Sequence, residues 1–277
     1  MMYNPKNMSG SRRKAALLAL GIFFLATLGF ASTTSASPEA ERLNDLLTRT
    51  ANQTSLFLDQ FSDVKCTEQV RQEKLGKDDK VELKEDSTYD YLVILTNAGG
   101  ELNLSESRIP MHAAKRDRKN TSMLLSNGFA TLFLVFHPYY AEAFKFTLVG
   151  EEVVGGRTLQ KVSFEHVPGM KSPAALALRG REYPLELTGT AWIDPQTGSI
   201  TKIQAGIADS LQDVGLKALN SEIDFAPVPF SDSKVVYWFP TSARVEVETP
   251  RQHWRNLHQF TAYKKFTVST EEQVTQK

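Results

Sequence analysis

The sequence predicts a mainly β protein of the α+β class, in which one helix precedes a series of antiparallel strands. The clearest signal is segment 182–211, which reads as one uninterrupted hairpin because apolar and polar side chains alternate along it. Asp194-Pro195 and Gly198 mark its turn, since proline presets φ and glycine can take a positive φ. Similar hairpin patterns recur along the chain without an evident linker, so we expect one domain over residues 37–277.

The helix is expected to begin at Ser37, which can cap it, with Pro38 and Glu39 in its first turn. Apolar residues then follow at helical spacing to about Phe61, giving one stripe that must pack on the sheet. A short second helix is predicted over 121–135, and residues 168–181 read as a loop. Strands are predicted at 64–75, 81–95, 101–109, 144–154, 158–167, 214–225, 235–239, 243–248 and 254–266, with Pro240 as a break.

Residues 1–36 have the layout of a secretory signal peptide: basic residues, an apolar run over 15–30, and then small residues. Cleavage is expected after Ala36, with Ala31 as the second choice and a retained membrane anchor as the alternative. We therefore expect a periplasmic or secreted protein. The remaining chain would carry 28 basic and 32 acidic residues, a net charge of −4, which does not suggest a nucleic-acid partner.

Cys66 is the single cysteine, so no intrachain disulfide can form. We expect it to be a small buried side chain on a strand, because free cysteine is among the most buried residue types. A chain exported without a disulfide must rely on its core for stability.

The sequence contains no recognisable catalytic motif or metal-ligand spacing. The five histidines are scattered, and His253 and His258 would face opposite sides of a strand. No nucleophile elbow and no glycine-rich phosphate loop leading into a helix is present. Acidic residues such as Glu68 and the pair Glu151-Glu152 are interpreted mainly as parts of a solvated sheet face, although a carboxylate pair for hydrolysis is left open. We thus expect neither an enzyme nor a cofactor.

Three phrases carry a resemblance to a known group: Tyr89-Asp90-Tyr91, Glu106-Ser107-Arg108, and the run from Gly189 to Gly198. With the exported N-terminal helix and the long antiparallel series, the chain resembles extracytoplasmic proteins of the outer-membrane lipoprotein-sorting group, which have a LolA-like fold. The resemblance covers roughly residues 38–270. It implies an open, incomplete antiparallel β-barrel, with the N-terminal helix and the short second helix on its concave side and an apolar cavity for acyl chains.

Two classes of function remain open from the sequence. The first is a carrier or sensor that binds a lipid or another hydrophobic ligand; the second is an envelope scaffold or regulatory protein with a fully packed barrel and a protein partner. For the first class, the expected cavity wall consists of aromatic and apolar strand residues, which are Tyr89, Tyr91, Val93, Phe144, Phe146, Trp192 and Trp238. Contact with a membrane surface is expected through the basic side chains of Lys115, Arg116, Arg118 and Lys119, unless that segment is simply a solvated loop.

Overall fold

The structure is a computed structural model, and it describes residues 37–98, 101–111, 132–178, 181–230 and 236–265. All described residues belong to one unit of the chain, Ser37–Lys277. The predicted signal peptide therefore lies outside the described residues, and its cleavage stays a prediction.

Helix α1 (Pro38–Ser62) begins and packs as its sequence dictates. The Ser37 hydroxyl accepts a hydrogen bond from the Ala40 amide at 3.2 Å, which satisfies one of the amides left open at a helix start. One side of the helix is buried, and its members recur at helical spacing: Leu46, Thr50, Thr54, Phe57, Leu58 and Phe61. The hydroxyls of Thr50 and Thr54 donate to the carbonyls of the residues four positions earlier, so these two polar side chains can be buried at little cost.

A ten-stranded antiparallel sheet forms the body of the domain, in the order β3-β2-β1-β12-β11-β10-β9-β8-β5-β4. The strand bounds are β1 (Val64–Leu75), β2 (Val81–Ala98), β3 (Glu101–Pro110), β4 (Phe144–Val154), β5 (Arg157–His166), β8 (Leu187–Ile193), β9 (Ile200–Ile207), β10 (Ala218–Val228), β11 (Tyr237–Glu248) and β12 (His253–Lys265). Most neighbours in the sheet are consecutive in the chain. Among the described strands there are two exceptions: β1, the first strand, pairs with β12, the last, and β5 pairs with β8 because the hairpin of β6 and β7 lies outside this sheet.

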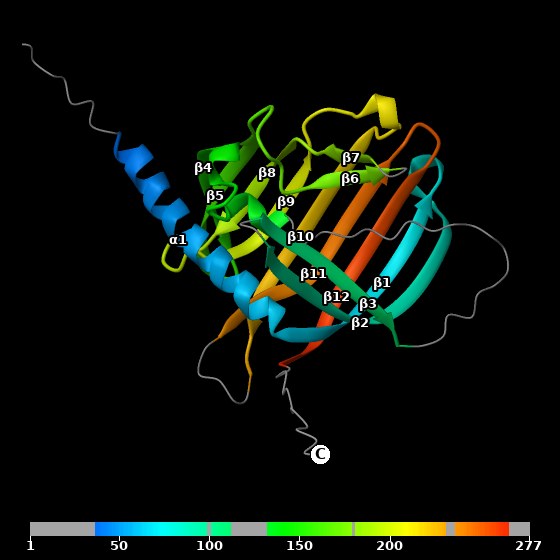
Figure 1. Ribbon diagram of the computed structural model, residues 1–277, viewed down its shortest axis with the longest axis horizontal. Coiled ribbons are helices and arrows are strands. Elements are labelled where there is room, and N and C mark those ends of the chain that lie inside the picture. Colours follow the sequence, from blue (N-terminus) through cyan, green and yellow to red (C-terminus); the bar gives the residue numbers. More distant parts are fainter. Residues whose placement is uncertain (1–36, 99–100, 112–131, 179–180, 231–235, 266–277) are drawn as a thin grey trace, which may run out of the picture. The chain divides into compact units, whose positions relative to one another are not determined.

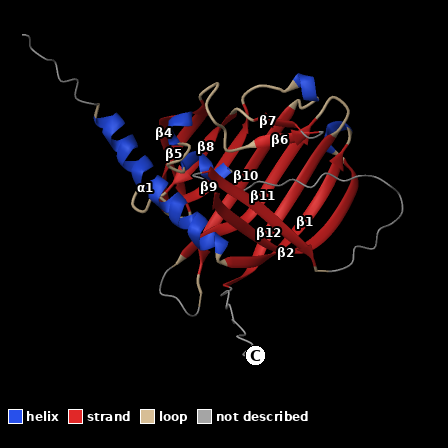
Figure 2. Cartoon of the chain, viewed as in Figure 1, coloured by secondary structure: helices blue, strands red, loops and turns tan. Residues whose placement is uncertain are grey.

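The sheet curves without closing, as the predicted incomplete barrel requires. Figure 1 shows the long strand β2 bending so that it and β3 cross in front of β10, β11 and β12. The two edges, β3 and β4, stand at opposite ends of the strand order and are not paired with each other. Helix α1 lies across the concave side, and Figure 2 shows how little other helix accompanies the strands in the described part of the chain.

Short elements complete the cover and the turns. A small hairpin of β6 (Ala175–Leu178) and β7 (Arg181–Pro184) stands apart from the main sheet, and Leu176 packs against the core. Single 3-10 turns are η1 (Lys77–Asp79), η2 (Leu134–Phe136), η3 (Ala141–Ala143) and η4 (Gln212–Val214). All three residues of η2 are buried. Of the predicted second helix at 121–135, only the residues from Leu132 onward are described, and they form a short helical turn that leads into η2.

The prediction of one uninterrupted hairpin over 182–211 was wrong in its first part. Residues 181–184 form β7 and pair with β6, so part of the predicted loop at 168–181 is also a strand. The paired strands of the predicted hairpin are β8 and β9, which begin only at Leu187. Pro184 explains the interruption, because it has no N–H to donate to a ladder and it ends β7.

The sequence predicted that Pro240 separates two strands, and this was wrong. Pro240 lies within the single strand β11. A register shift places Pro240 opposite Phe225 and Ser242 opposite Asp224. Such a bulge tolerates a residue that lacks an N–H. The carbonyl of Pro240 is also used, since it accepts a hydrogen bond from the Tyr263 hydroxyl at 2.6 Å.

Candidate functional site

An aromatic cluster fills the space between the C-terminal half of α1 and the sheet. The ring of Phe57 stacks on Phe133 with centroids 4.3 Å apart and meets the edges of Phe225 and Phe239 at 6.1 Å. Phe61 contacts Phe239 at 5.1 Å, and further contacts of Phe61 reach Tyr91 and Tyr263. Two helix side chains are thus inserted into an aromatic wall that is built largely by the strands.

The middle of α1 is held against the turn between β8 and β9. Gly198 in that turn has φ of +76°, and a Cβ added there would lie 2.6 Å from the Arg49 carbonyl carbon and 2.8 Å from the Thr50 amide nitrogen. Only glycine permits both this conformation and this approach. The turn predicted from Asp194 to Gly198 therefore positions the helix, and Asp194 organises the turn by accepting hydrogen bonds from the amides of Gln196 and Thr197.

A buried ion-paired cluster lies on the same face of the sheet, toward its β3 end. Glu68 on β1 has no exposed surface, and its carboxylate accepts hydrogen bonds from Nε and Nη2 of Arg108 on β3, the second at 2.8 Å. Arg108 also donates to Glu106 at 2.9 Å, and its guanidinium lies 4.9 Å from the centre of the Tyr91 ring. Nδ1 of His258 lies 2.8 Å from Oε1 of Glu68, the oxygen that also accepts the hydrogen bond from Nη2 of Arg108. We call Glu68, Glu106, Arg108 and His258 the interior polar cluster.

The charges of this cluster are stabilised by one another. Burial alone would raise the pKa of Glu68, but the hydrogen bonds from His258 and Arg108 outweigh it and lower that pKa. Burial opposes the charge of Arg108 as well, and the carboxylates of Glu68 and Glu106 raise its pKa. Both groups therefore stay ionised inside the domain, where removing one would leave the other uncompensated.

The residues predicted as a cavity wall do not form one group. Tyr91 and Val93 are buried on β2 and belong to the main core, with Tyr91 between Phe61, Phe260 and Arg108, while Tyr89 on the same strand is only partly buried. Phe144 and Phe146 pack farther along, near Phe136, Phe164 and His166. Trp238 packs at the margin of the core beneath Arg157.

Trp192 lies on the opposite face of the sheet, which no helix of the described residues covers and which we call the helix-free face. Its neighbours in the chain, Ala191 and Ile193, belong to the core cluster, and its cross-strand partners are Lys161 and Lys202. Both ammonium groups lie within 5.6 Å of the ring centre, and the indole N–H donates to Glu152 at 2.8 Å. Trp192 was expected in the cavity wall with the other aromatic residues; the alternation along β8, which groups Trp192 with polar Thr188 and Thr190, was the available signal for the opposite face.

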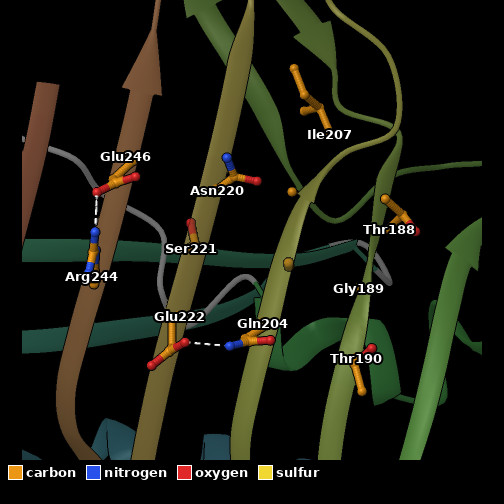
Figure 3. A pocket seen from close by; sticks show the side chains of 12 residues that line it. Thr188, Gly189, Thr190, Gln204, Ile207, Asn220, Ser221, Glu222, Arg244 and Glu246 are labelled. Carbon is orange, nitrogen blue, oxygen red and sulfur yellow. Dashed lines mark hydrogen bonds and ion pairs between the residues drawn. The ribbon is translucent and has the colours of Figure 1, made fainter. Parts of the chain in front are cut away.

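A shallow hollow of about 410 Å³ lies on this helix-free face, across β8, β9, β10 and β11 (Figure 3). The outward side chains around it are polar: Thr188, Thr190, Gln204, Asn220, Glu222, Arg244 and Glu246. Two further hollows, of about 120 and 550 Å³, flank the first half of α1 and share Arg42, Leu148 and Gln160. None of these three hollows opens among the aromatic rings under α1.

Sequence reasoning missed the interior polar cluster. Glu68 was interpreted as part of a solvated face, and the structure corrects this, because it is fully buried. Its partners are 40 and 190 residues away in the chain, so no local pattern joins them. The one available signal was that Glu68 shares its alternation with the apolar residues Val64, Cys66 and Val70 on β1.

Cys66 is buried on β1 as predicted, and burial raises the pKa of its thiol to about 12. Within the described ranges, no group of three or more potential metal ligands occurs, and no helix is long and apolar enough to cross a membrane. The basic residues at 115–119 lie outside the described residues.

No family model matches the sequence, and no curated protein is significantly similar to it. Solved structures with a similar fold include a LolA superfamily protein of Nitrosomonas europaea, with 9% identity and a TM-score of 0.38 over 80% of this chain and 94% of that one. A DUF1329 family protein of Desulfovibrio piger shows 11% identity and a TM-score of 0.42 over 84% and 100% of the two chains. An outer membrane lipoprotein-sorting protein domain of Vibrio parahaemolyticus shows 9% and 0.40 over 83% and 93%. The first and third of these names are those of the group that the sequence resembles, and identities this low concern the fold alone.

Proposed function

We propose that the protein is exported and binds a lipid or another ligand with a long apolar part on the face of the sheet that α1 covers. It would act as a carrier or sensor without catalytic activity of its own. The observation that carries this proposal is the aromatic wall, which the strands build and into which α1 inserts Phe57 and Phe61. An acyl chain could take the place of these rings, because dispersion contacts with aromatic side chains do not depend on direction.

The way α1 is attached supports a role as a removable cover. The helix is joined to the sheet by one residue, Asp63, before β1 begins. Its first turns are largely exposed, and its middle rests on the turn at Gly198. A rotation about Asp63 would withdraw Phe57 and Phe61 from the wall without breaking any strand pairing.

The interior polar cluster gives the same face an amphipathic character. Tyr91 contacts both Phe61 of the aromatic cluster and Arg108 of the polar cluster. A ligand with an apolar tail and a polar end would find both kinds of surface on one side of the sheet. The carboxylates of Glu68 and Glu106 are each held by Arg108, an arrangement better suited to orienting a ligand than to activating water. Delivery at a membrane surface would use the basic residues 115–119.

The test is native mass spectrometry of the exported chain purified without detergent, followed by solvent extraction and lipid analysis. We expect lipid to accompany the protein in a near-stoichiometric amount. Phe57→Ala should change the amount or the chain length of the bound lipid, since it removes the ring stacked on Phe133. Leu56→Ala is the matched control, because Leu56 is the neighbouring residue and is 46% exposed. An unliganded mass that does not shift on addition of fatty acids or phospholipids would overturn the proposal.

The dense aromatic packing under α1 favours a second candidate, an envelope protein with a filled interior that binds another protein. This candidate predicts that the apo mass persists and that Phe57→Ala acts only on stability. The same lipid experiment separates the two candidates, and a protein captured by crosslinking on intact cells would then be sought.

A further inference from the structure

The polar hollow on the helix-free face lies on the other side of the sheet from the proposed lipid site. We propose that this hollow binds a neutral saccharide, independently of any ligand under α1. Its size is in the range of small-molecule sites. Unlike such sites for apolar ligands, the side chains around it are hydroxyl, amide, carboxylate and guanidinium groups (Figure 3).

The hollow is open at its centre because the residue there is a glycine, Gly206, which has no side chain. In the row of cross-strand partners Thr188, Gly206 and Asn220, the central residue has no Cβ. A Cβ on Gly206 would lie 2.8 Å from both Oδ1 of Asn220 and the carbonyl oxygen of Leu219. A larger residue would therefore fill the centre of the hollow and displace the Asn220 amide that borders it.

The charges of the hollow are already paired, so it has little net attraction for an ion. Glu222 lies 2.8 Å from the ammonium of Lys202 and also accepts a hydrogen bond from the Gln204 amide. These contacts, the first from Lys202, lower the pKa of Glu222 against the effect of burial. Arg244 donates to Glu246 on the same strand. A charged ligand would have to compete with these pairs, whereas a neutral ligand would not.

The hydrogen-bonding capacity that remains is neutral and is distributed over neighbouring strands. No side-chain hydrogen bond joins Thr190 or Asn220 to another described residue, and Gln204 uses its amide nitrogen on Glu222 while its carbonyl oxygen stays available. Side chains on adjacent strands stand about 4.8 Å apart, and those two positions along one strand about 6.8 Å apart. This grid offers donors and acceptors on several sides of a compact ring, which matches a sugar with hydroxyl groups around its rim.

The neighbouring row supplies an indole beside the hollow. Trp192 follows Thr190 by two positions on β8, and Lys202 precedes Gln204 by two on β9, so both face the same side as the hollow. Because the Trp192 ring lies beneath Lys202, a ligand that contacts Lys202 or Glu222 should alter the Trp192 fluorescence.

The experiment is isothermal titration calorimetry of the full chain with chitotetraose, maltotetraose and mannotetraose, with tetragalacturonate as the anionic comparison. We expect one of the neutral sugars to bind with 1:1 stoichiometry and to change the Trp192 fluorescence, an effect absent in Trp192→Phe. Asn220→Leu should weaken this binding about tenfold or more, as expected for losing hydrogen bonds and placing an apolar group at the rim. Asn220 is exposed, so the variant should fold.

Gln259→Leu is the matched control, because Gln259 is an exposed amide on β12 that does not line the hollow. It should bind the sugar as the unaltered chain does. Absence of binding by all three neutral sugars, binding of tetragalacturonate alone, or equal binding by Asn220→Leu would each overturn the proposal. Lipid loading is measured separately, so failure here leaves the lipid proposal unaffected.

Discussion

The guanidinium of Arg108 reaches across β2 to grip both oxygens of the Glu68 carboxylate, with Nη2 at 2.8 Å from Oε1. The two side chains are 8% and 0% exposed. Because β2 separates their strands, this contact ties β3 to β1 across the strand that lies between them. The interior polar cluster is therefore a structural joint as well as the polar end of the proposed ligand site.

The first prediction concerns the removal of one charge from this joint. Arg108→Met should reduce the free energy of unfolding by about 3–5 kcal/mol, because it leaves Glu68 and Glu106 buried without their shared cation. Arg71→Met is the control, since Arg71 on β1 also pairs with a carboxylate, that of Asp86 on the neighbouring strand β2, yet both side chains are about half exposed. That variant should lose no more than about 1 kcal/mol. Urea unfolding measures both free energies. Equal losses in the two variants would contradict the prediction that the buried ion pair contributes more to stability than the exposed one.

The second prediction is a pH dependence carried by Glu68. The folded-state pKa lies below the ordinary value of 4.5, so the contribution of this group to stability is present above that value. As the pH falls below 4.5, the unfolded chain binds a proton that the folded chain resists, and the free energy of unfolding decreases. We expect the gap in stability between the unaltered chain and Glu68→Gln to be constant near neutral pH and to shrink toward about pH 3. A gap that stays constant over this range would contradict the depressed pKa.

Local patterns were sufficient for most of the sheet. The predicted ranges 64–75 and 144–154 coincide with β1 and β4, because alternation and turn glycines are written in consecutive residues. The errors at Pro184 and Pro240 have one cause: the effect of a proline depends on whether its strand has a partner on that side, and the partner is remote in the chain.

The candidate sites were predicted less well, for a related reason. Whether Glu68 is solvated or buried depends on Arg108 and His258, which only the pairing of β1 with β2 and β12 brings near. The hollow depends on Gly206 standing between Thr188 and Asn220 on neighbouring strands. Both sites depend on which residues of neighbouring strands stand opposite one another. The sequence indicates this register only for two strands joined by a short turn, and not for strands that are remote in the chain.

The third prediction uses the single cysteine. At about pH 8 almost none of the Cys66 thiol should be ionised in the folded chain, because its pKa is raised to about 12 and only the thiolate reacts readily. A thiol reagent such as dithionitrobenzoate should therefore leave the folded chain nearly unmodified and label one thiol per chain in urea. Rapid labelling of the folded chain would mean that β1 opens locally near Cys66.

The fourth prediction tests the contact between Gly198 and α1. Gly198→Ala and Gly215→Ala both place a side chain at positive φ, with φ of +76° and +73°, and should share a backbone cost of about 1–2 kcal/mol. Only Gly198→Ala also forces a Cβ against Arg49 and Thr50, whereas nothing lies within 4 Å of a Cβ at Gly215. We expect a further loss of about 1–3 kcal/mol in Gly198→Ala alone, as for other overpacked contacts.

Hydrogen exchange shows whether this further loss is local to the helix. The amides of α1 should exchange faster in Gly198→Ala than in Gly215→Ala, while those of β1 and β12 change little relative to α1. If α1 is the removable cover of a lipid site, Gly198→Ala should also take up added fatty acid faster than Gly215→Ala. Equal exchange of α1 in both variants would mean that the turn between β8 and β9 does not hold the helix, and the cover would then depend on Phe57 and Phe61 alone.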